Sequence, residues 1–254
     1  MIIAAILAGG VGSRMGNVNT PKQYLQLGGK PILVHTAEKF LVHPRVEHVV
    51  VLTPHAWLDF TRDILAQHLP RDRQAAVIEG GDTRNNTLRA ALQYAAQRFG
   101  EEEDHILITH DAVRPFVTHR IISDNIDAAR AHGACDTVVP ATDTIVRSDD
   151  GEFITRIPPR KTMYQGQTPQ SFRAGRLREL MDTLLPEEEA VLTDACKIYS
   201  LRGEPVALVR GEIHNIKITY PYDLTVAHAL LGMEANAEAI ASTENKVSAE
   251  ETPC

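Results

Sequence analysis

Residues 2–23 read IIAAILAGGVGSRMGNVNTPKQ, an apolar run that passes directly into a glycine-rich segment. The apolar run at 2–8 is too short to span a membrane and predicts a buried first strand. Four glycines between residues 9 and 16 let backbone N–H groups approach an anion closely, and the N-terminus of a following helix would add partial positive charge. A strand followed by such a loop is typical of a phosphate-binding site.

The charges of the loop favour the same interpretation. Arg14 and Lys22 are its charged residues, and no acidic residue precedes Glu38, although the chain of 254 residues carries a formal net charge of −7. Arginine offers phosphate oxygens a planar fork of donors and lysine a point charge, whereas a nearby carboxylate would repel a triphosphate. A glycine turn with two solvated basic residues is the alternative. Met15 stands where the dinucleotide-binding fingerprint needs a glycine, and no G-x-x-x-x-G-K-[ST] spacing occurs, so both of those motifs are excluded.

Composition narrows the class of protein. The hydrophobic fraction of 43% and the charged fraction of 23% are those of a soluble globular protein. An acidic chain without a Lys/Arg run argues against a nucleic-acid or membrane-surface binder. Cys135, Cys196 and Cys254 are scattered and form no C-x-x-C pair, so we expect neither a disulfide framework nor a zinc site, and a cytoplasmic location. The first apolar run has no basic region before it, so we do not interpret it as a signal peptide.

Short apolar runs alternate with longer amphipathic segments up to residue 141. Strands are expected at 2–8, 47–53, 75–79, 105–110 and 136–141. Helices are expected between them at 32–42, 56–68, 84–98 and 119–132. The alternation predicts βαβ units and therefore a Rossmann-like, three-layer α/β fold, with a mostly parallel sheet and helices on both faces.

The pattern changes after residue 141. Residues 143–157 predict two short strands around an Asp150-Gly151 turn, and the Pro158-Pro159 pair cannot lie inside a central strand. We therefore expect a projecting antiparallel β-arm over about 143–165. The elements expected after the arm are helices near 174–184 and 194–200, strands at 205–210 and 213–219, and a helix from Pro221 to about Gly232. Residues 1–233 are assigned to one domain, and the Ala- and Glu-rich tail 234–254 is expected to be disordered.

Five stretches of the chain resemble one known family. They are LAGGVGSRMG with PKQYLQLGGKPIL at 7–33, EGGDTRNNTL at 79–88, THDAVRPF at 109–116, YQGQTPQSF at 164–172 and NIKITYPYDL at 215–224. In this order they are similar to the nucleotidyltransferases that activate sugars and polyols. More narrowly, they resemble the family of 2-C-methyl-D-erythritol 4-phosphate and ribitol-5-phosphate cytidylyltransferases. The stretches extend over nearly the whole chain except the tail.

This resemblance implies a CTP site. The residues implied in nucleotide binding are Leu7, Ala8, Gly9, Gly10, Gly12, Gly81, Asp82 and Thr87. Arg14, Lys22 and Lys217 are implied as the catalytic cations at the phosphates. The residues alone also allow simpler roles: Asp82 as the cap of a helix that runs through Leu88 and Leu92, and Lys217 as a solvent-facing strand residue.

Asp111 ends the predicted strand ILIT, and ligands of open α/β sheets bind beyond the carboxyl ends of strands. The position suits a Mg²⁺ ion that also binds substrate phosphates. A helix N-cap or an ion pair with Arg114 are the alternatives for Asp111, and Arg114 either orients it or contacts substrate. His110 is expected to be a packed or hydrogen-bonded residue rather than a ligand.

The resemblance also implies an acceptor site and a partner. The residues implied in acceptor binding are Arg114, Thr144, Arg160, Thr168 and Thr219. In the family the arm crosses a two-fold axis, so that Arg160 would reach the partner's acceptor site in a homodimer. An exposed hairpin is marginally stable alone, which agrees with that expectation. The implied reaction transfers CMP from CTP to a polyol phosphate with Mg²⁺ as cofactor, and the acceptor's phosphate, with a second pKa of about 6, needs no general base.

The identity of the acceptor stays open at this point. THDAVRPF, MYQGQTPQSF and LTDACKI look like the ribitol-5-phosphate enzymes of teichoic acid synthesis, so ribitol 5-phosphate is the expected acceptor. The alternative is 2-C-methyl-D-erythritol 4-phosphate, of isoprenoid synthesis. A non-catalytic nucleotide-binding regulator is a further alternative, against which the retention of Arg14, Lys22, Asp111 and Lys217 argues. A glycosyltransferase of similar topology would usually carry a D-x-D metal motif, which is missing.

Overall fold

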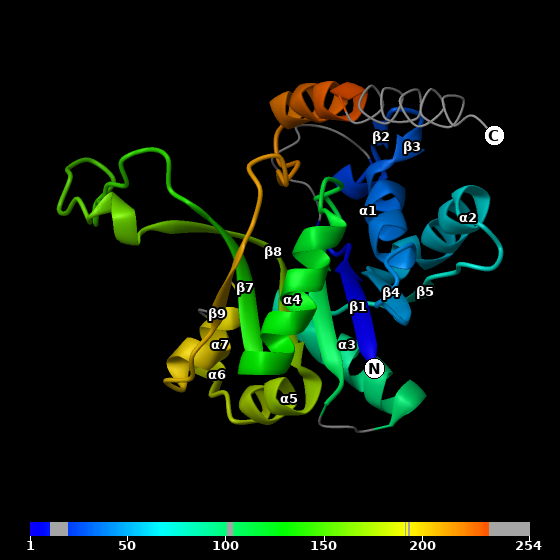
Figure 1. The fold of residues 1–254 in the computed structure, drawn as a ribbon, viewed down its shortest axis with the longest axis horizontal. Coiled ribbons are helices and arrows are strands. Elements are labelled where there is room, and N and C mark those ends of the chain that lie inside the picture. Colours follow the sequence, from blue (N-terminus) through cyan, green and yellow to red (C-terminus); the bar gives the residue numbers. More distant parts are fainter. Residues whose placement is uncertain (11–19, 101–103, 191, 193, 234–254) are drawn as a thin grey trace, which may run out of the picture.

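The computed structural model describes residues 1–10, 20–100, 104–190, 192 and 194–233. They include a seven-stranded sheet in the order β5-β4-β1-β6-β8-β7-β9. The strands are β1 (Ile2–Leu7), β4 (His48–Thr53), β5 (Ala76–Glu79), β6 (Ile106–Asp111), β7 (Ala134–Pro140), β8 (Tyr164–Arg173) and β9 (Ala207–Arg210). Every neighbouring pair is parallel except the two that β8 makes with β6 and β7 (Figure 1), so the predicted mostly parallel sheet is confirmed.

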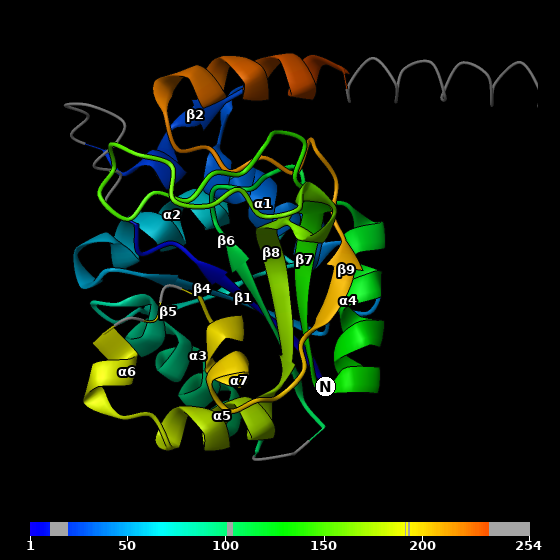
Figure 2. The ribbon, with the colours of Figure 1, turned by 90° about the vertical axis from the view of Figure 1, so that its left-hand side faces the viewer.

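Helices cover both faces of this sheet. On one face lie α1 (Ile32–Leu41), α2 (Leu58–His68) and α4 (His119–His132); on the other lie α3 (Arg84–Phe99), α5 (Ala174–Asp182) and α7 (Cys196–Leu201), as Figure 2 shows for α4 against α3, α5 and α7. Successive side chains of a strand point to opposite faces. Ile2, Ala4 and Ile6 of β1 therefore pack in the first core, and Ile3 and Ala5 in the second. The predicted three-layer α/β architecture is confirmed.

A third apolar cluster lies at the carboxyl end of the sheet. The short strands β2 (Gln26–Leu27) and β3 (Lys30–Pro31) pack there against a helix that begins at residue 221 (Figure 1). The carboxylate of Asp223 accepts the N–H groups of Thr219 and Tyr220 at 2.7 and 2.8 Å, which caps that helix, and Pro221 suits its first turn. Ile218 is buried in the cluster, so the segment before the helix is held over the end of β6.

The sequence does not predict β8, the one antiparallel strand of the sheet. Pro169 within it argues against a central strand, because proline cannot donate a ladder hydrogen bond. The structure accommodates Pro169 after a cis peptide bond and outside both registers. β6 pairs with Gln170–Arg173, and the β7 ladder shifts between Asp136 and Val138.

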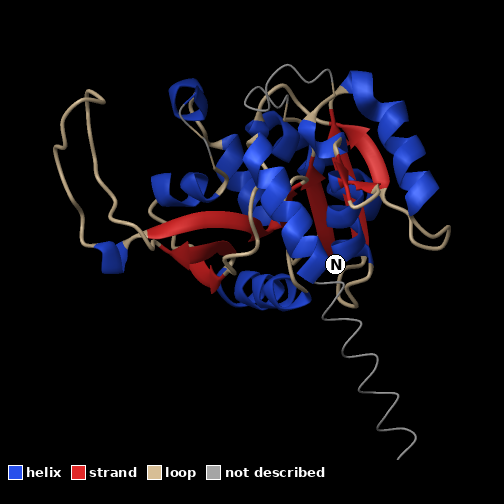
Figure 3. Ribbon diagram, turned by 90° about the horizontal axis from the view of Figure 1, so that it is seen from above, coloured by secondary structure: helices blue, strands red, loops and turns tan. Residues whose placement is uncertain are grey.

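Two other expectations need correction. The arm between β7 and β8 does project away from the sheet (Figures 1 and 3), but its two predicted strands are reduced to one isolated bridge between Arg147 and Arg156. The chain bends at the expected Asp150-Gly151 position, where Gly151 has a φ of +82°. The predicted strand at 213–219 is wrong, because that segment pairs with no strand. Its backbone is bound instead by the Arg114 guanidinium, which donates to the Asn215 carbonyl, and by the Val113 carbonyl, which accepts from Ile218.

The short elements that remain are α6 (Pro186–Ala190) and the 3-10 turns η2 (Lys22–Tyr24), η3 (His55–Trp57) and η4 (Arg160–Thr162). Cys135 and Cys196 are buried free thiols. Within the described ranges, no helix is both long and apolar enough to cross a bilayer. The predicted disordered tail 234–254 lies outside the described residues.

Candidate active site

A cleft of about 340 Å³ lies beyond the carboxyl ends of β1 and β6. Its lining residues come from the ends of β1 and β6 and the loops after β1, β5 and β6, from η2, from the first turn of α3 and from the segment before the last helix. They are Leu7, Ala8, Gly9, Gly10, Lys22, Gln23, Gly81, Asp82, Thr83, Arg84, Thr87, Asp111, Ala112, Val113, Lys217 and Thr219. Every described residue that the sequence analysis assigned to the nucleotide, the catalytic cations or the metal lines this cleft. Gly12 and Arg14 lie outside the described residues.

The loop after β1 is open toward the cleft and has Lys22 beside it. Gln23 holds the start of the loop, since its Nε2 donates to the Ala8 carbonyl at 2.6 Å. A Cβ on Gly9 would meet nothing within 4 Å, and one on Gly10 would lie 3.9 Å from the Lys22 Cε. The backbone at Gly9 is therefore accessible from the cleft, as a ligand that binds N–H groups requires.

The loop after β5 forms the opposite wall. A Cβ on Gly81 would lie 2.2 Å from the Asn86 Cβ and 2.7 Å from its carbonyl carbon, so only glycine fits at 81. The Thr87 hydroxyl lies 3.1 Å from both the N–H and the carbonyl of Gly81, which ties the loop to α3. The sequence-based assignment of Asp82 as the helix cap is wrong: Thr83 is the N-cap, and its hydroxyl accepts the Asn86 N–H at 3.1 Å. The exposed Asp82 lines the cleft instead.

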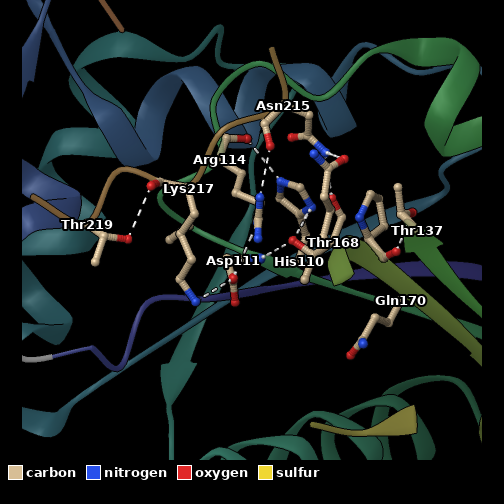
Figure 4. Close-up of polar contacts among 12 residues, drawn as sticks. His110, Asp111, Arg114, Thr137, Thr168, Gln170, Asn215, Lys217 and Thr219 are labelled. Carbon is tan, nitrogen blue, oxygen red and sulfur yellow. Dashed lines mark hydrogen bonds and ion pairs between the residues drawn. The ribbon is translucent and has the colours of Figure 1, made fainter. Parts of the chain in front are cut away.

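Asp111 is nearly buried and meets three cations. Its Oδ1 lies 2.9 Å from Arg84 Nη1, and its Oδ2 lies 2.9 Å from Lys217 Nζ and 3.6 Å from Arg114 Nε (Figure 4 shows the Lys217 and Arg114 sides). Burial alone would raise the pKa of Asp111, but the charges of Arg84, Lys217 and Arg114 outweigh it and hold the pKa well below its ordinary value. Asp111 is therefore an ionised carboxylate near neutral pH.

A single ionised carboxylate suits Mg²⁺, because that ion is usually bound by one or two carboxylates together with substrate phosphates and water. No group of three or more His, Cys, Asp and Glu side chains that could hold a metal occurs in the part of the chain that the structure describes. Asp111 and Asp82 are carboxylates that line the cleft, and Asp111 is one that could hold Mg²⁺ together with substrate phosphate oxygens.

Arg84 is a residue of the cleft that the sequence analysis did not single out. It is the first residue of α3 and pairs with Asp111. A cation at a helix N-terminus opposes the positive end of the helix dipole, so its position brings no benefit to the helix. That unfavourable placement within EGGDTRNNTL is the signal that could have identified it.

The residues that the resemblance implies in acceptor binding do not all line the same hollow. Thr219 lines the cleft, whereas Arg114 lines a neighbouring groove of about 1000 Å³. Lys217 lines both. Thr168 is buried, and its hydroxyl contacts the Asp111 N–H and the His110 ring rather than either hollow.

Thr144 and Arg160 lie on the exposed arm and line neither hollow. Arg160 donates to the Thr142 carbonyl at 3.0 Å, and Thr142 is at the edge of the groove. Within one chain the fold therefore brings Lys22, Asp111, Lys217 and Thr219 together and leaves the arm residues apart.

Comparison with known proteins gives one consistent result. The family model of 2-C-methyl-D-erythritol 4-phosphate cytidylyltransferase matches residues 2–233. A 4-diphosphocytidyl-2C-methyl-D-erythritol synthase from Anaerococcus prevotii is 28% identical with a TM-score of 0.75, and the match covers 91% of this chain and 96% of that one. A 2-C-methyl-D-erythritol 4-phosphate cytidylyltransferase from Thermus thermophilus is 30% identical with a TM-score of 0.68, covering 91% and 98%. The enzyme of that name from Francisella tularensis is 27% identical with a TM-score of 0.73, covering 89% and 97%.

Proposed function

This chain belongs to the 2-C-methyl-D-erythritol 4-phosphate cytidylyltransferase family of nucleotidyltransferases, and we propose that it transfers CMP from CTP to 2-C-methyl-D-erythritol 4-phosphate with release of pyrophosphate. The names of the similar enzymes support this acceptor over the ribitol 5-phosphate that the motifs alone favour. The observation that carries the proposal is the cleft lined by the two glycine-containing loops, in which Arg84 and Lys217 pair with Asp111 and Lys22 lines the wall.

The nucleotide half of the proposal follows from the walls of the cleft. Backbone groups at Ala8, Gly9 and Gly81 would bind the base and ribose, with Asp82 and Thr87 beside them. Leu7 and Gly10 complete this wall. At the end of the cleft that contains Asp111, the two cations Arg84 and Lys217 outnumber the one carboxylate. This excess of positive charge suits the triphosphate.

In the proposed reaction, a phosphate oxygen of the acceptor attacks the α-phosphorus of CTP in line. The bond between the α-phosphorus and the bridging oxygen breaks, and pyrophosphate leaves with that electron pair. Lys22 and Arg14 would stabilise the negative charge that accumulates at the α-phosphate and on the leaving group, and Lys217 would hold the attacking phosphate against repulsion. Mg²⁺ bound at Asp111 would neutralise charge on the substrate phosphates.

The acceptor would bind where the groove meets the cleft. Lys217 lines both hollows, and Arg114 and Thr219 lie on either side of it. Thr168 is buried, and its hydroxyl contacts Asp111 and His110, so we do not expect it to contact the acceptor. The groove has polar and basic residues such as Arg210 and Gln165 at its walls, which suits a polyol phosphate.

A homodimer is part of the proposal. Val146, Phe153, Ile154 and Ile157 of the arm are large apolar side chains left exposed in the single chain. Apolar side chains gathered on a projecting arm suit contact with a second copy. Thr144 and Arg160 of that arm would then complete the partner's acceptor site.

The acceptor is tested with purified protein, CTP and Mg²⁺, by following pyrophosphate release and identifying the product by mass spectrometry. Release with 2-C-methyl-D-erythritol 4-phosphate and none with ribitol 5-phosphate is the expected result. Release with ribitol 5-phosphate alone would replace the acceptor and keep the site. Binding of CTP without release in either case would favour the non-catalytic regulator.

A further inference from the structure

His110 is a fully buried polar side chain beside the reaction centre that the proposed chemistry does not use. It precedes Asp111 in β6, and its ring contacts Phe40 of α1, with 5.0 Å between ring centroids. Both ring nitrogens have polar partners (Figure 4): Nδ1 lies 3.0 Å from the Thr168 hydroxyl, and Nε2 lies 3.0 Å from the Arg114 carbonyl oxygen. These two contacts satisfy the hydrogen-bonding groups of the buried ring and connect it to Thr168 and Arg114.

The direction of each hydrogen bond follows from its partners. The Arg114 carbonyl can only accept, so Nε2 carries the proton. Nδ1 is then the nitrogen with the lone pair, and it accepts from the Thr168 hydroxyl. That leaves the Thr168 oxygen to accept the Asp111 N–H, which it does at 3.1 Å. The chain of donors thus runs from Asp111 through Thr168 and His110 to Arg114.

Further hydrogen bonds close this chain into a ring around the reaction centre. Arg114 Nη1 donates to the Asn215 carbonyl at 2.8 Å, and Asn215 Nδ2 donates to the Thr168 carbonyl at 2.9 Å. Two residues after Asn215 comes Lys217, whose Nζ lies 2.9 Å from Asp111 Oδ2. Because 213–219 has no strand partner, these contacts and the Ile218–Val113 hydrogen bond hold it in place.

We propose that His110 and Thr168 form a positioning relay for the transfer reaction, which sets the distance between Asp111 and Lys217 by joining the end of β6 to the segment that carries Lys217. The relay contacts no substrate. It assigns the Thr168 hydroxyl to Asp111 and His110 rather than to the acceptor. The inference rests on the proposed function, because turnover is read from that reaction.

The test is a double-mutant cycle of His110→Phe and Thr168→Val, which keep volume and remove the hydrogen bonds. Each single variant should lower kcat by about 10- to 100-fold while KM for CTP stays within about threefold of wild type, because misplacement of reacting groups acts on the chemical step. The double variant should lose no more than the worse single variant, since both remove the same connection. His110→Asn, which keeps an acceptor near Nδ1, should recover part of the kcat lost in His110→Phe.

Thr137→Val is the matched control. Thr137 is a buried threonine of the neighbouring strand β7 (Figure 4). Its hydroxyl donates to the Pro169 carbonyl at 2.6 Å and accepts from Asn125 Nδ2 at 2.8 Å. It should lower Tm and leave kcat unchanged. Wild-type kcat in folded Thr168→Val, additive losses in the double variant, or an equal kcat loss in Thr137→Val would overturn the relay.

A measurement without turnover separates this inference from the proposed function. In ¹⁵N spectra of histidine-labelled protein, His110 should show a protonated Nε2 and an unprotonated Nδ1 near neutral pH, and Thr168→Val should shift the Nδ1 resonance. The opposite tautomer would overturn the relay. Wild-type protein that shows the expected tautomer but releases no pyrophosphate with either acceptor would overturn the proposed function alone.

Discussion

Lys217 and Asp111 meet with 2.9 Å between Nζ and Oδ2, although they come from segments that are far apart in the chain. Asp111 ends β6, and Lys217 lies in an irregular segment that crosses the end of the sheet. Arg84 reaches the other carboxylate oxygen from α3, also at 2.9 Å. One buried carboxylate therefore organises cations from three parts of the fold, and its removal has consequences for both stability and activity.

Asp111→Asn should abolish turnover and lower the free energy of unfolding at neutral pH by about 3 kcal/mol, because breaking a buried ion pair leaves its partner charge uncompensated. Arg114 is the most buried of the cations concerned. Urea unfolding of the two proteins measures the difference. Equal stability of wild type and variant would contradict the account of the site.

The same variant has a defined pH dependence. The folded pKa of Asp111 lies well below the model-compound value of 3.8, so the unfolded chain takes up the proton first as the pH falls. The stability that the ion pairs contribute is present above about pH 4 and is lost progressively below it. The difference between wild type and Asp111→Asn should therefore be constant near neutrality and shrink in acid. A difference that grew in acid would be inconsistent with this sign.

Lys22→Ala should reduce kcat/KM by about 100-fold, the loss expected when a group that stabilises transition-state charge is removed. Lys22 lines the cleft beside Gly10. Lys30→Ala is the control, since Lys30 pairs with Glu38 at 2.6 Å outside the cleft. Steady-state pyrophosphate release distinguishes the two. Normal turnover in Lys22→Ala would refute the proposed role of this lysine.

Gly81→Ala should reduce the stability of the protein, whereas Gly9→Ala should weaken the binding of CTP. A Cβ at 81 would overlap Asn86, so Gly81→Ala should lower the free energy of unfolding by about 1–3 kcal/mol through overpacking. A Cβ at 9 meets nothing, so Gly9→Ala should keep the wild-type Tm and raise KM for CTP, because the methyl group would enter the space of the nucleotide. Thermal unfolding and CTP titration of both variants measure this contrast. The same change in Tm and in KM for CTP in both variants would contradict the prediction.

Asp136→Asn should stabilise the protein above about pH 6. Burial raises the pKa of Asp136 to about 6; the hydrogen bond from Gln170 opposes this and the charge of Asp194 adds to it. The folded state thus binds the proton more tightly than the unfolded chain, and stability falls as the pH rises through the window from 3.8 to about 6. At pH 8 the variant should be more stable by roughly 3 kcal/mol, since one pKa unit corresponds to about 1.4 kcal/mol, and the gain should vanish below about pH 4. Chemical unfolding at several pH values tests this, and a gain that increased toward acid would contradict it.

Phe153→Ser with Ile154→Ser should dissociate the proposed dimer. Both side chains are exposed on the arm, at 70% and 60%. Leu185→Ser, at an exposed leucine outside the arm, is the control and should keep the wild-type association state. Sedimentation velocity measures the mass. Wild-type protein that stayed monomeric at all concentrations would show that the expected homodimer is wrong.

Most of the sheet and its helices could be predicted, because each carries its signal locally. β1, β4, β6 and α4 lie within two residues of the ranges expected from hydrophobic pattern. The elements that were missed lack such a signal. β8 contains Pro169, which lies among the unpaired residues 167–169 where the β7–β8 ladder is irregular. Residues 213–219 have an apolar alternation but no strand beside them.

The candidate site divides in the same way. Gly9, Gly81 and Asp111 stand in recognisable motifs at or just after the ends of strands, and Lys22 closes the first glycine-rich segment, so their approach to one cleft could be expected. The position of Arg84 at a helix N-terminus could have drawn attention to it, but only the structure shows that its guanidinium pairs with Asp111. For Thr168 the sequence implied contact with the acceptor, whereas its hydroxyl faces Asp111 and His110.

The sequence by itself determined the α/β alternation, the phosphate-binding character of the first loop and the family, because periodicity, glycine spacing and motif order are properties of the chain alone. Only the tertiary structure decided which cations share Asp111, how His110 is hydrogen-bonded and where Lys217 lies. Those relationships join residues of β6, β8, α3 and the segment before the last helix. They arise when the packed sheet brings distant segments together and buries their polar groups, which must then find partners in one another.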